Sequence, residues 1–243
     1  MKLPVAISHL AQEVRDAFAP ARCIGCLTEG TWYCASCRHA APPHVLTCIG
    51  CKQEQMRGMT CIACREDTPL TGIISAGMYS NQILQRGIEW LKFKGVRSVA
   101  HILAGLIIPQ LSAIAPIDDL SSHAILVPIP LHSWRSRTRG FNQSEDIASA
   151  IGTLCGIQVM PLLTRVHATA SQAKLPHDMR RENMEAAFSL NISRDEYDEM
   201  LSHKPIVILV DDVATTGATL TSAAHALSPT SGTQVWGAVV AKG

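Results

Sequence analysis

The sequence lacks a large net charge of either sign. Its 21 lysines and arginines are balanced by 20 aspartates and glutamates, which gives a formal charge of +1. A chain so close to neutral exerts no long-range attraction on nucleic acid, so any such binding must come from a local basic patch. Hydrophobic residues make up 47% and charged residues 17% of the chain. This balance is typical of a folded α/β protein and argues against extensive disorder.

The sequence also lacks a long hydrophobic run. Its longest apolar stretch, residues 102–117, is interrupted by Pro109, Gln110 and Ser112 and is too short to cross a bilayer. Residues 1–20 contain charged positions and no continuous apolar core, so they predict an amphipathic helix rather than a secretory signal. We therefore expect a soluble, cytoplasmic protein without membrane insertion.

Cysteine is nearly absent outside residues 23–64. Within that segment, eight of the nine cysteines form four Cys-x-x-Cys pairs. The pairs are Cys23 and Cys26, Cys34 and Cys37, Cys48 and Cys51, and Cys61 and Cys64. One such turn places two thiolates on one side of a metal and a second turn completes a tetrahedron, so the spacing predicts two structural zinc ions. The simplest pairing is sequential, as two zinc ribbons in tandem, and a cross-braced pairing is the alternative. A redox dithiol or an iron–sulfur cluster is less favoured.

The function of this cysteine-rich segment has two interpretations. Its basic residues outnumber its acids, and two aromatic rings lie among them, which would suit single-stranded nucleic acid. These residues are Arg22, Arg38, Lys52, Arg57 and Arg65, with Trp32 and Tyr33 as candidate stacking rings. The alternative is a small metal-stapled module that packs on the main domain.

The composition changes near residue 68. Residues 21–68 are predicted as the zinc module, since they cannot bury enough apolar surface to fold without cross-links. Residues 69–243 alternate apolar runs with amphipathic stretches, which predicts an α/β domain with a mostly parallel sheet flanked by helices. Strands are expected at residues 72–79, 124–129, 157–163, 206–210 and 235–240. Helices are expected at residues 82–93, 96–111 (ending near Pro109), 142–155 (with Ile147, Ile151 and Leu154 inward) and 218–227, and a loop at 167–185.

The most informative motif follows the strand expected at residues 206–210. That strand should deliver the chain to the sheet edge where α/β proteins bind ligands. Two carboxylates come next, then a turn of small and hydroxyl residues that opens a helix and favours a phosphate. The residues are Asp211, Asp212, Val213, Ala214, Thr215, Thr216, Gly217, Ala218 and Thr219. The carboxylates can hold vicinal sugar hydroxyls directly or through Mg²⁺, so the motif predicts a phosphorylated ribose site.

An apolar strand ending in two aspartates is also found in nucleotide hydrolases. Those proteins need a Gly-x-x-x-x-Gly-Lys-Ser/Thr loop as well, and no Gly-Lys pair occurs in this chain. The hydrolase interpretation therefore fails.

The motif resembles the site for 5-phosphoribosyl 1-pyrophosphate (PRPP) in type I phosphoribosyltransferases. More closely, nearly the whole chain resembles the ComF family of bacterial competence and DNA-utilisation proteins, which join a cysteine-rich zinc module to such a domain. The resemblance rests on four elements. They are residues 207–220, Trp90-Leu-Lys-Phe-Lys-Gly95, Val127-Pro-Ile-Pro130 with Arg139-Gly-Phe-Asn-Gln143, and Thr169-x-x-Gln172-x-x-Leu175 followed by residues 180–188.

The resemblance implies further site residues. A pyrophosphate loop would carry Arg135, Arg137 and Arg139, whose guanidinium groups suit that anion and whose other interpretation is a solvated basic turn. A flexible loop over the reaction would contribute Gln172, Lys174, Arg180, Arg181 and Asn183. Asn142 and Gln143 could cap a helix or orient the ligand. Lys92 and Lys94 are weaker candidates for phosphate or nucleic-acid contact.

Two functions follow from these features. In the first, the protein binds PRPP with Mg²⁺ and serves in DNA uptake and transformation, with single-stranded DNA and uptake or recombination proteins as partners. In the second, it is an active cytoplasmic phosphoribosyltransferase of nucleotide metabolism. Asp211 and Asp212 would then be catalytic, and ribose 5-phosphate would pass to an acceptor that the sequence does not identify.

Overall fold

The computed structural model describes residues 21–39, 45–131, 140–166, 187–227 and 232–243. The chain divides into two compact units, Met1–Pro43 and His44–Gly243. This division falls between the second and third Cys-x-x-Cys pairs, inside the segment predicted as one zinc module. The helix predicted over residues 1–20 and the loop predicted at 167–185 lie outside the described residues.

The first unit is built around its four cysteines. A tight turn at Cys23 leads to the short helix α2 (Ala35–His39). Ile24 and Tyr33, which are 0% and 4% exposed, supply its buried hydrophobic side chains. So small a core needs a cross-link to be stable.

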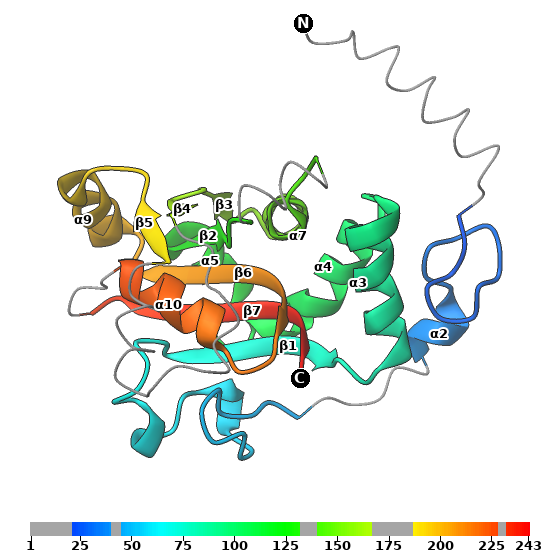
Figure 1. Cartoon of the computed structure of the whole chain (residues 1–243), viewed down its shortest axis with the longest axis horizontal. Helices are drawn as coiled ribbons and strands as arrows, with labels where there is room; N and C mark the ends of the chain where they lie inside the picture. Colours follow the sequence, from blue (N-terminus) through cyan, green and yellow to red (C-terminus); the bar gives the residue numbers. More distant parts are fainter. Residues whose placement is uncertain (1–20, 40–44, 132–139, 167–186, 228–231) are drawn as a thin grey trace, which may run out of the picture. The chain divides into compact units, whose positions relative to one another are not determined.

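The second unit contains a five-stranded sheet in the order β1-β7-β6-β2-β3, in which every pair is parallel (Figure 1). Its strands are β1 (Gly72–Met78), β2 (Ala124–Pro128), β3 (Gln158–Val159), β6 (Ile206–Ala214) and β7 (Gln234–Lys242). A separate antiparallel pair joins β4 (Leu163–Arg165) to β5 (Phe188–Leu190). The predicted α/β architecture with a mostly parallel sheet is therefore confirmed.

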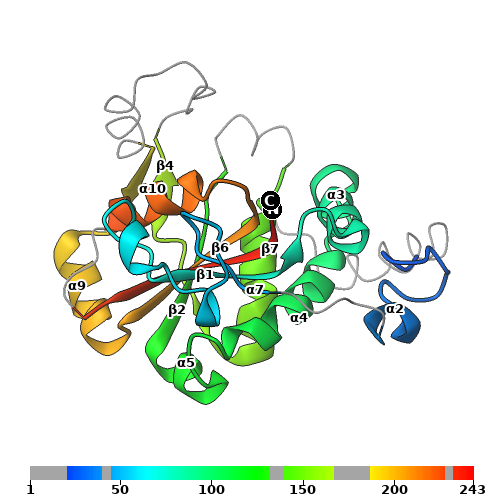
Figure 2. The ribbon, with the colours of Figure 1, turned by 90° about the horizontal axis from the view of Figure 1, so that it is seen from below.

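Helices cover both faces of this sheet. They are α3 (Gln82–Lys94), α4 (Val99–Leu111), α5 (Ile117–His123), α7 (Gln143–Cys155), α9 (Arg194–His203) and α10 (Ala218–Leu227), with the 3₁₀ turns η1 (Met56–Gly58) and η2 (Ile62–Cys64) before the sheet. Figure 2 shows α10 on one side of the sheet and α4 and α5 on the other. Among the described residues, no helix combines the length and the apolar character needed to span a membrane.

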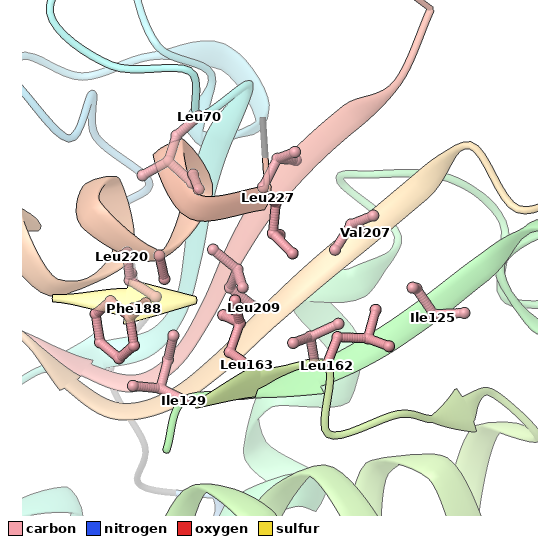
Figure 3. Close-up of a cluster of buried hydrophobic side chains, with 14 of the residues drawn as sticks. Leu70, Ile125, Ile129, Leu162, Leu163, Phe188, Val207, Leu209, Leu220 and Leu227 are labelled. Carbon is pink, nitrogen blue, oxygen red and sulfur yellow. The ribbon is translucent and has the colours of Figure 1, made fainter. Parts of the chain in front are cut away.

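The core follows from the period-two alternation of the strands. Val207 and Leu209 of β6 point to the α10 side, where they cluster with Leu220, Leu227 and Phe188 (Figure 3). The residues between them, such as Ile208, are equally buried on the other face, where α7 packs on β6. Burial on both faces explains why the strand is an unbroken apolar run.

Several sequence-based boundaries differ from the structure. The strand expected to end at Val210 continues to Ala214, because β7 pairs with it throughout, up to Ala214 opposite Lys242. The carboxylates therefore belong to the strand itself. Leu154, expected to face inward, is 54% exposed. It lies in the last turn of α7, next to the C-terminal residue Cys155.

Two expectations about the helices are also corrected. The helix α4 begins at Val99 rather than at residue 96, and it ends within the predicted range at Leu111, which is fully buried. Pro109 lies in the last turn of this helix, and the hydroxyl of Ser112 donates to the Pro109 carbonyl at 2.7 Å. The short helices α5 and α9 were not predicted, since few apolar positions mark them.

Two helical glycines provide a test of this packing. A Cβ on Gly105 of α4 would meet nothing within 4 Å, whereas one on Gly152 of α7 would lie 2.7 Å from the Val159 side chain and 2.8 Å from the Ile157 carbonyl oxygen. We expect Gly105→Ala to stabilise the protein by about 0.5–1 kcal/mol through helix propensity. Gly152→Ala should instead destabilise it by about 1–3 kcal/mol. Urea unfolding measures both, and equal effects of the two substitutions would contradict the described α7–β3 contact.

Candidate functional site

The predicted ligand-binding motif forms one continuous feature at the carboxyl end of β6. Asp211 and residues 213–220 line a small hollow between the end of the strand and the start of α10. Gly217 has a φ of +78°, which glycine adopts without strain. The N–H of Ala218 donates to the hydroxyl of Thr216 at 3.3 Å, so this threonine supports the first turn of the helix. The first turn of α10 thus faces an exposed threonine-rich turn, an arrangement suited to an anion.

The two carboxylates are held by different helices. Asp212 is 8% exposed, and its Oδ1 lies 2.8 Å from the Nζ of Lys92 on α3. The Oδ1 of Asp211 accepts a hydrogen bond of 2.9 Å from the hydroxyl of Ser144 on α7 and another of 2.9 Å from the N–H of Asp212. The site therefore brings together side chains separated by up to 120 positions in the sequence.

The ionisation of Asp211 reflects this crowding. Burial raises the pKa of Asp211, and the neighbouring charge of Asp212 raises it further. The hydrogen bonds from the Asp212 N–H and the Ser144 hydroxyl and the charge of Lys92 oppose this effect, and the resulting pKa is about 7. A carboxyl with this pKa exchanges a proton near neutrality and gains from any ligand that supplies donors or positive charge.

The start of α7 fixes Ser144. The side chain of Asn142 accepts from the Ser144 N–H at 3.2 Å and donates to the Ile129 carbonyl oxygen at 3.0 Å. Asn142 is therefore the N-cap of α7, which was one of the two roles considered for it. Its bond to Ile129 also links α7 to the chain after β2. The neighbouring Gln143 is fully buried, and neither of its amide atoms has a hydrogen-bond partner in the described structure.

The structure describes only part of the predicted site. Arg135, Arg137 and Arg139 of the pyrophosphate loop lie outside the described residues, as do Gln172, Lys174, Arg180, Arg181 and Asn183 of the flexible loop. Of the two weaker candidates, Lys92 reaches Asp212, while the Nζ of Lys94 lies 5.0 Å from the centre of the Trp90 ring. Sequence reasoning missed Ser144, although it directly follows the Asn142-Gln143 pair that the family resemblance singled out.

The cysteines form two groups of four, each with all Sγ atoms within 4.8 Å of one another. The first contains Cys23, Cys26, Cys34 and Cys37, and the second contains Cys48, Cys51, Cys61 and Cys64. The grouping is thus sequential rather than cross-braced. In each group one pair of Sγ atoms from different turns, Cys26 with Cys34 and Cys51 with Cys61, lies 3.7 Å apart. A tetrahedron with Zn–S bonds of about 2.3 Å has edges of about 3.8 Å, so both groups fit zinc.

The thiols of each group differ in acidity. Burial raises the pKa of Cys23 and of Cys48, but surrounding backbone N–H groups outweigh it and lower both pKa values. For Cys23 two of these hydrogen bonds, from the N–H groups of Gly25 and Cys34, measure 3.3 Å each. Hydrogen bonding to Cys34 raises the pKa of Cys37, and hydrogen bonding to Cys61 likewise raises that of Cys64. Four thiolates so close together need a cation, as a structural metal site provides.

One candidate nucleic-acid contact is not supported. Tyr33 was expected to offer a stacking ring, but it is 4% exposed and its hydroxyl donates to the Cys37 carbonyl at 3.1 Å. The ring is used to fill the small core beside the cysteines. The guanidinium of Arg38 lies 5.6 Å from the centre of this ring, and Arg22 pairs with Glu29 at 2.8 Å, so both cations have local partners.

The fold and the site define an α/β protein with a parallel sheet, a carboxylate pair at its edge and two cysteine groups of zinc type. No protein-family model matches the chain. It is 28% identical to Competence protein F of Haemophilus influenzae, over 88% of each chain. It is also 28% identical to DNA utilization protein YhgH of Salmonella typhimurium, over 84% of this chain and 88% of that protein. The protein of that name from Escherichia coli K12 is 27% identical, over 86% and 91%. The chain is therefore a homologue of these proteins, which confirms its ComF resemblance.

Metal content tests the cysteine groups. We expect purified protein to contain about two zinc ions per chain, and Cys34→Ser and Cys61→Ser each to retain about one, because each removes one ligand of a different group. Atomic emission on protein purified without added metal gives the stoichiometry. Cys155→Ser is the control, since Cys155 belongs to neither group, and it should leave the content unchanged. Fewer than one zinc per wild-type chain would refute the assignment.

Proposed function

We propose that the protein binds PRPP together with Mg²⁺ at the residues 211–219. The observation that carries this proposal is the joining of a carboxylate pair to a threonine-rich turn at the N-terminus of α10. A phosphorylated sugar carries an anion at one end and vicinal hydroxyls at the other. The turn offers N–H and hydroxyl donors for the phosphate, and Asp211 and Asp212 offer acceptors for the sugar hydroxyls.

The residues act in distinct ways in this proposal. The turn at residues 215–219 holds the 5-phosphate, and the two carboxylates hold the ribose hydroxyls. The same carboxylates could hold Mg²⁺, which would supply positive charge to the pyrophosphate. Ser144 keeps the Asp211 carboxylate in place, and Lys92 offsets the charge of Asp212 at 2.8 Å until the ligand binds. Arg135, Arg137 and Arg139 are proposed to hold the pyrophosphate.

The biological role we propose is the handling of incoming DNA in the cytoplasm during uptake and transformation. This proposal is supported by the names of the similar proteins, which refer to competence and DNA utilization. Within the second unit, Lys52, Arg57 and Arg65 are exposed around the second cysteine group. Exposed cations on a rigid module suit the phosphates of single-stranded DNA.

A second candidate is an active phosphoribosyltransferase, and the pKa of Asp211 near 7 favours it. A carboxyl with that pKa can accept a proton from an attacking nucleophile at neutral pH. The C1–O bond to pyrophosphate would break, the nucleophile of the acceptor would bond to C1, and its proton would pass to the carboxylate. The acceptor is not identified by the described residues.

Calorimetry with PRPP and Mg²⁺ tests the binding proposal. We expect wild-type protein to bind, and Asp211→Asn with Asp212→Asn to lose binding, because amides hold neither metal nor hydroxyls as carboxylates do. The control is Asp118→Asn with Asp119→Asn, an exposed adjacent pair on α5, which should bind as wild type does. Absence of heat with wild-type protein would refute the proposal. Pyrophosphate release from PRPP, with and without bases or DNA, then separates a transferase from a binder.

A gel shift at low salt tests the DNA role. Single-stranded DNA should shift with wild-type protein, and Lys52→Ala with Arg57→Ala should weaken binding and reduce the slope of log affinity against log salt by roughly one to two. Lys204→Ala, which changes a cation after α9, is the matched control and should leave the slope unchanged. Absence of any shift with wild-type protein would count against direct DNA contact.

A further inference from the structure

The two cysteine groups begin with the same turn. Both contain the sequence Cys-Ile-Gly-Cys, at Cys23 and at Cys48, and in both the next residue, Leu27 or Lys52, has a positive φ of 67° or 61°. In both, the N–H of that residue donates to the carbonyl of the first cysteine. The same Cys-Ile-Gly-Cys turn therefore occurs twice in the chain, and substitutions in the first turn can serve as controls for substitutions in the second.

The second turn, at residues 48–51, lies against residues 215–219, called here the phosphate loop because the proposed function places the 5-phosphate there. Its Ile49 is 3% exposed and belongs to the hydrophobic cluster that contains Leu220 of α10. A Cβ placed on Gly217 would lie only 2.5 Å from the Cδ1 and Cγ1 atoms of Ile49. The Ile49 side chain therefore rests on the glycine of the loop and occupies the space that any larger residue there would need.

A buried lysine ties the same turn to the sheet beside the loop. Lys242 is 2% exposed, and its Nζ donates to the Thr47 carbonyl at 2.9 Å, the Thr47 hydroxyl at 2.6 Å and the Cys48 carbonyl at 3.0 Å. In the β6–β7 ladder Lys242 is the partner of Ala214, the residue just before the threonine turn. The second turn thus contacts Gly217 directly and is linked to Ala214 through Lys242.

The metal determines whether this support is rigid. Ile49 lies between Cys48 and Cys51, so two ligands of one ion fix the backbone on each side of it. Without the ion only short turns and hydrogen bonds hold this segment, and such segments open easily. The loop must keep its N–H groups aimed at one point to bind a phosphate, and small displacements weaken such sites.

We propose that the second cysteine group is a positioning element for the phosphate loop, acting through Ile49, so that ligand binding at residues 211–219 depends on metal in this group. The dependence of ligand binding rests on the proposed function, whereas the ordering of the loop does not. Ile49 is a positioning residue, since it acts through Gly217 and not on the ligand.

The test compares Ile49→Ala with Ile49→Val and with Ile24→Ala, the equivalent position in the first turn. Hydrogen exchange of residues 211–220 is measured without ligand, alongside zinc content and PRPP affinity. We expect Ile49→Ala to keep two zinc ions yet to exchange about tenfold faster in the loop and to bind PRPP about tenfold more weakly. In Ile49→Val the loop exchange rate and the PRPP affinity should stay close to those of the wild-type protein. Ile24→Ala should change neither the loop exchange rate nor the PRPP affinity.

The metal itself is tested with Cys61→Ser and Cys34→Ser, and exchange in the centre of β6 serves as the check that the domain is folded. Loss of zinc from the second group should speed loop exchange, and loss from the first should not. Reciprocally, PRPP should slow the removal of zinc from the second group by a chelator. Loop exchange that is unchanged in both Ile49→Ala and Cys61→Ser would overturn the proposal. Failure of PRPP to bind wild-type protein would instead overturn only the proposed function, because loop exchange is measured without it.

Discussion

Two adjacent aspartates at the end of β6 place like charges in a partly buried space, and side chains from two helices of the second unit contact them. The hydroxyl of Ser144 and the ammonium of Lys92 each hold one carboxylate, from helices on different parts of the sheet edge. The pKa of Asp211 stays raised in spite of them. Burial is the larger cause and the neighbouring charge of Asp212 the smaller one, and a cationic or donor-rich ligand would favour the charged form of this carboxyl.

The second cysteine group is connected to the same end of β6 through Ile49. A second unit with a buried parallel sheet has a sufficient core of its own, yet it contains a metal turn whose isoleucine is part of that core. The Ile49 side chain of this turn lies directly against Gly217, in the turn that follows β6.

The sequence predicts the elements that depend on local pattern. Apolar runs identified β1, β2, β6 and β7, whereas the strand expected at residues 157–163 is only β3 (Gln158–Val159), and β5 was not predicted. The Cys-x-x-Cys spacing identified the sequential cysteine groups as the simplest pairing, and the acidic motif lies at a strand end. The contacts of Lys92 and Ser144 depend on how α3 and α7 meet the sheet edge, which no local pattern specifies. The extension of β6 to Ala214 required its pairing with β7, and the burial of Tyr33 required the shape of a very small core. The position of Ile49 on Gly217 joins residues 168 positions apart and was not predictable.

The most direct test of the central claim is a crystal structure of the protein grown with PRPP and Mg²⁺. The account predicts phosphate density within hydrogen-bond distance of the N–H groups of residues 215–219. It also predicts the ribose against Asp211 and Asp212, with Lys92 withdrawn from the Asp212 carboxylate. Density for the ligand at another place, or an unchanged Lys92–Asp212 pair beside an empty loop, would contradict it.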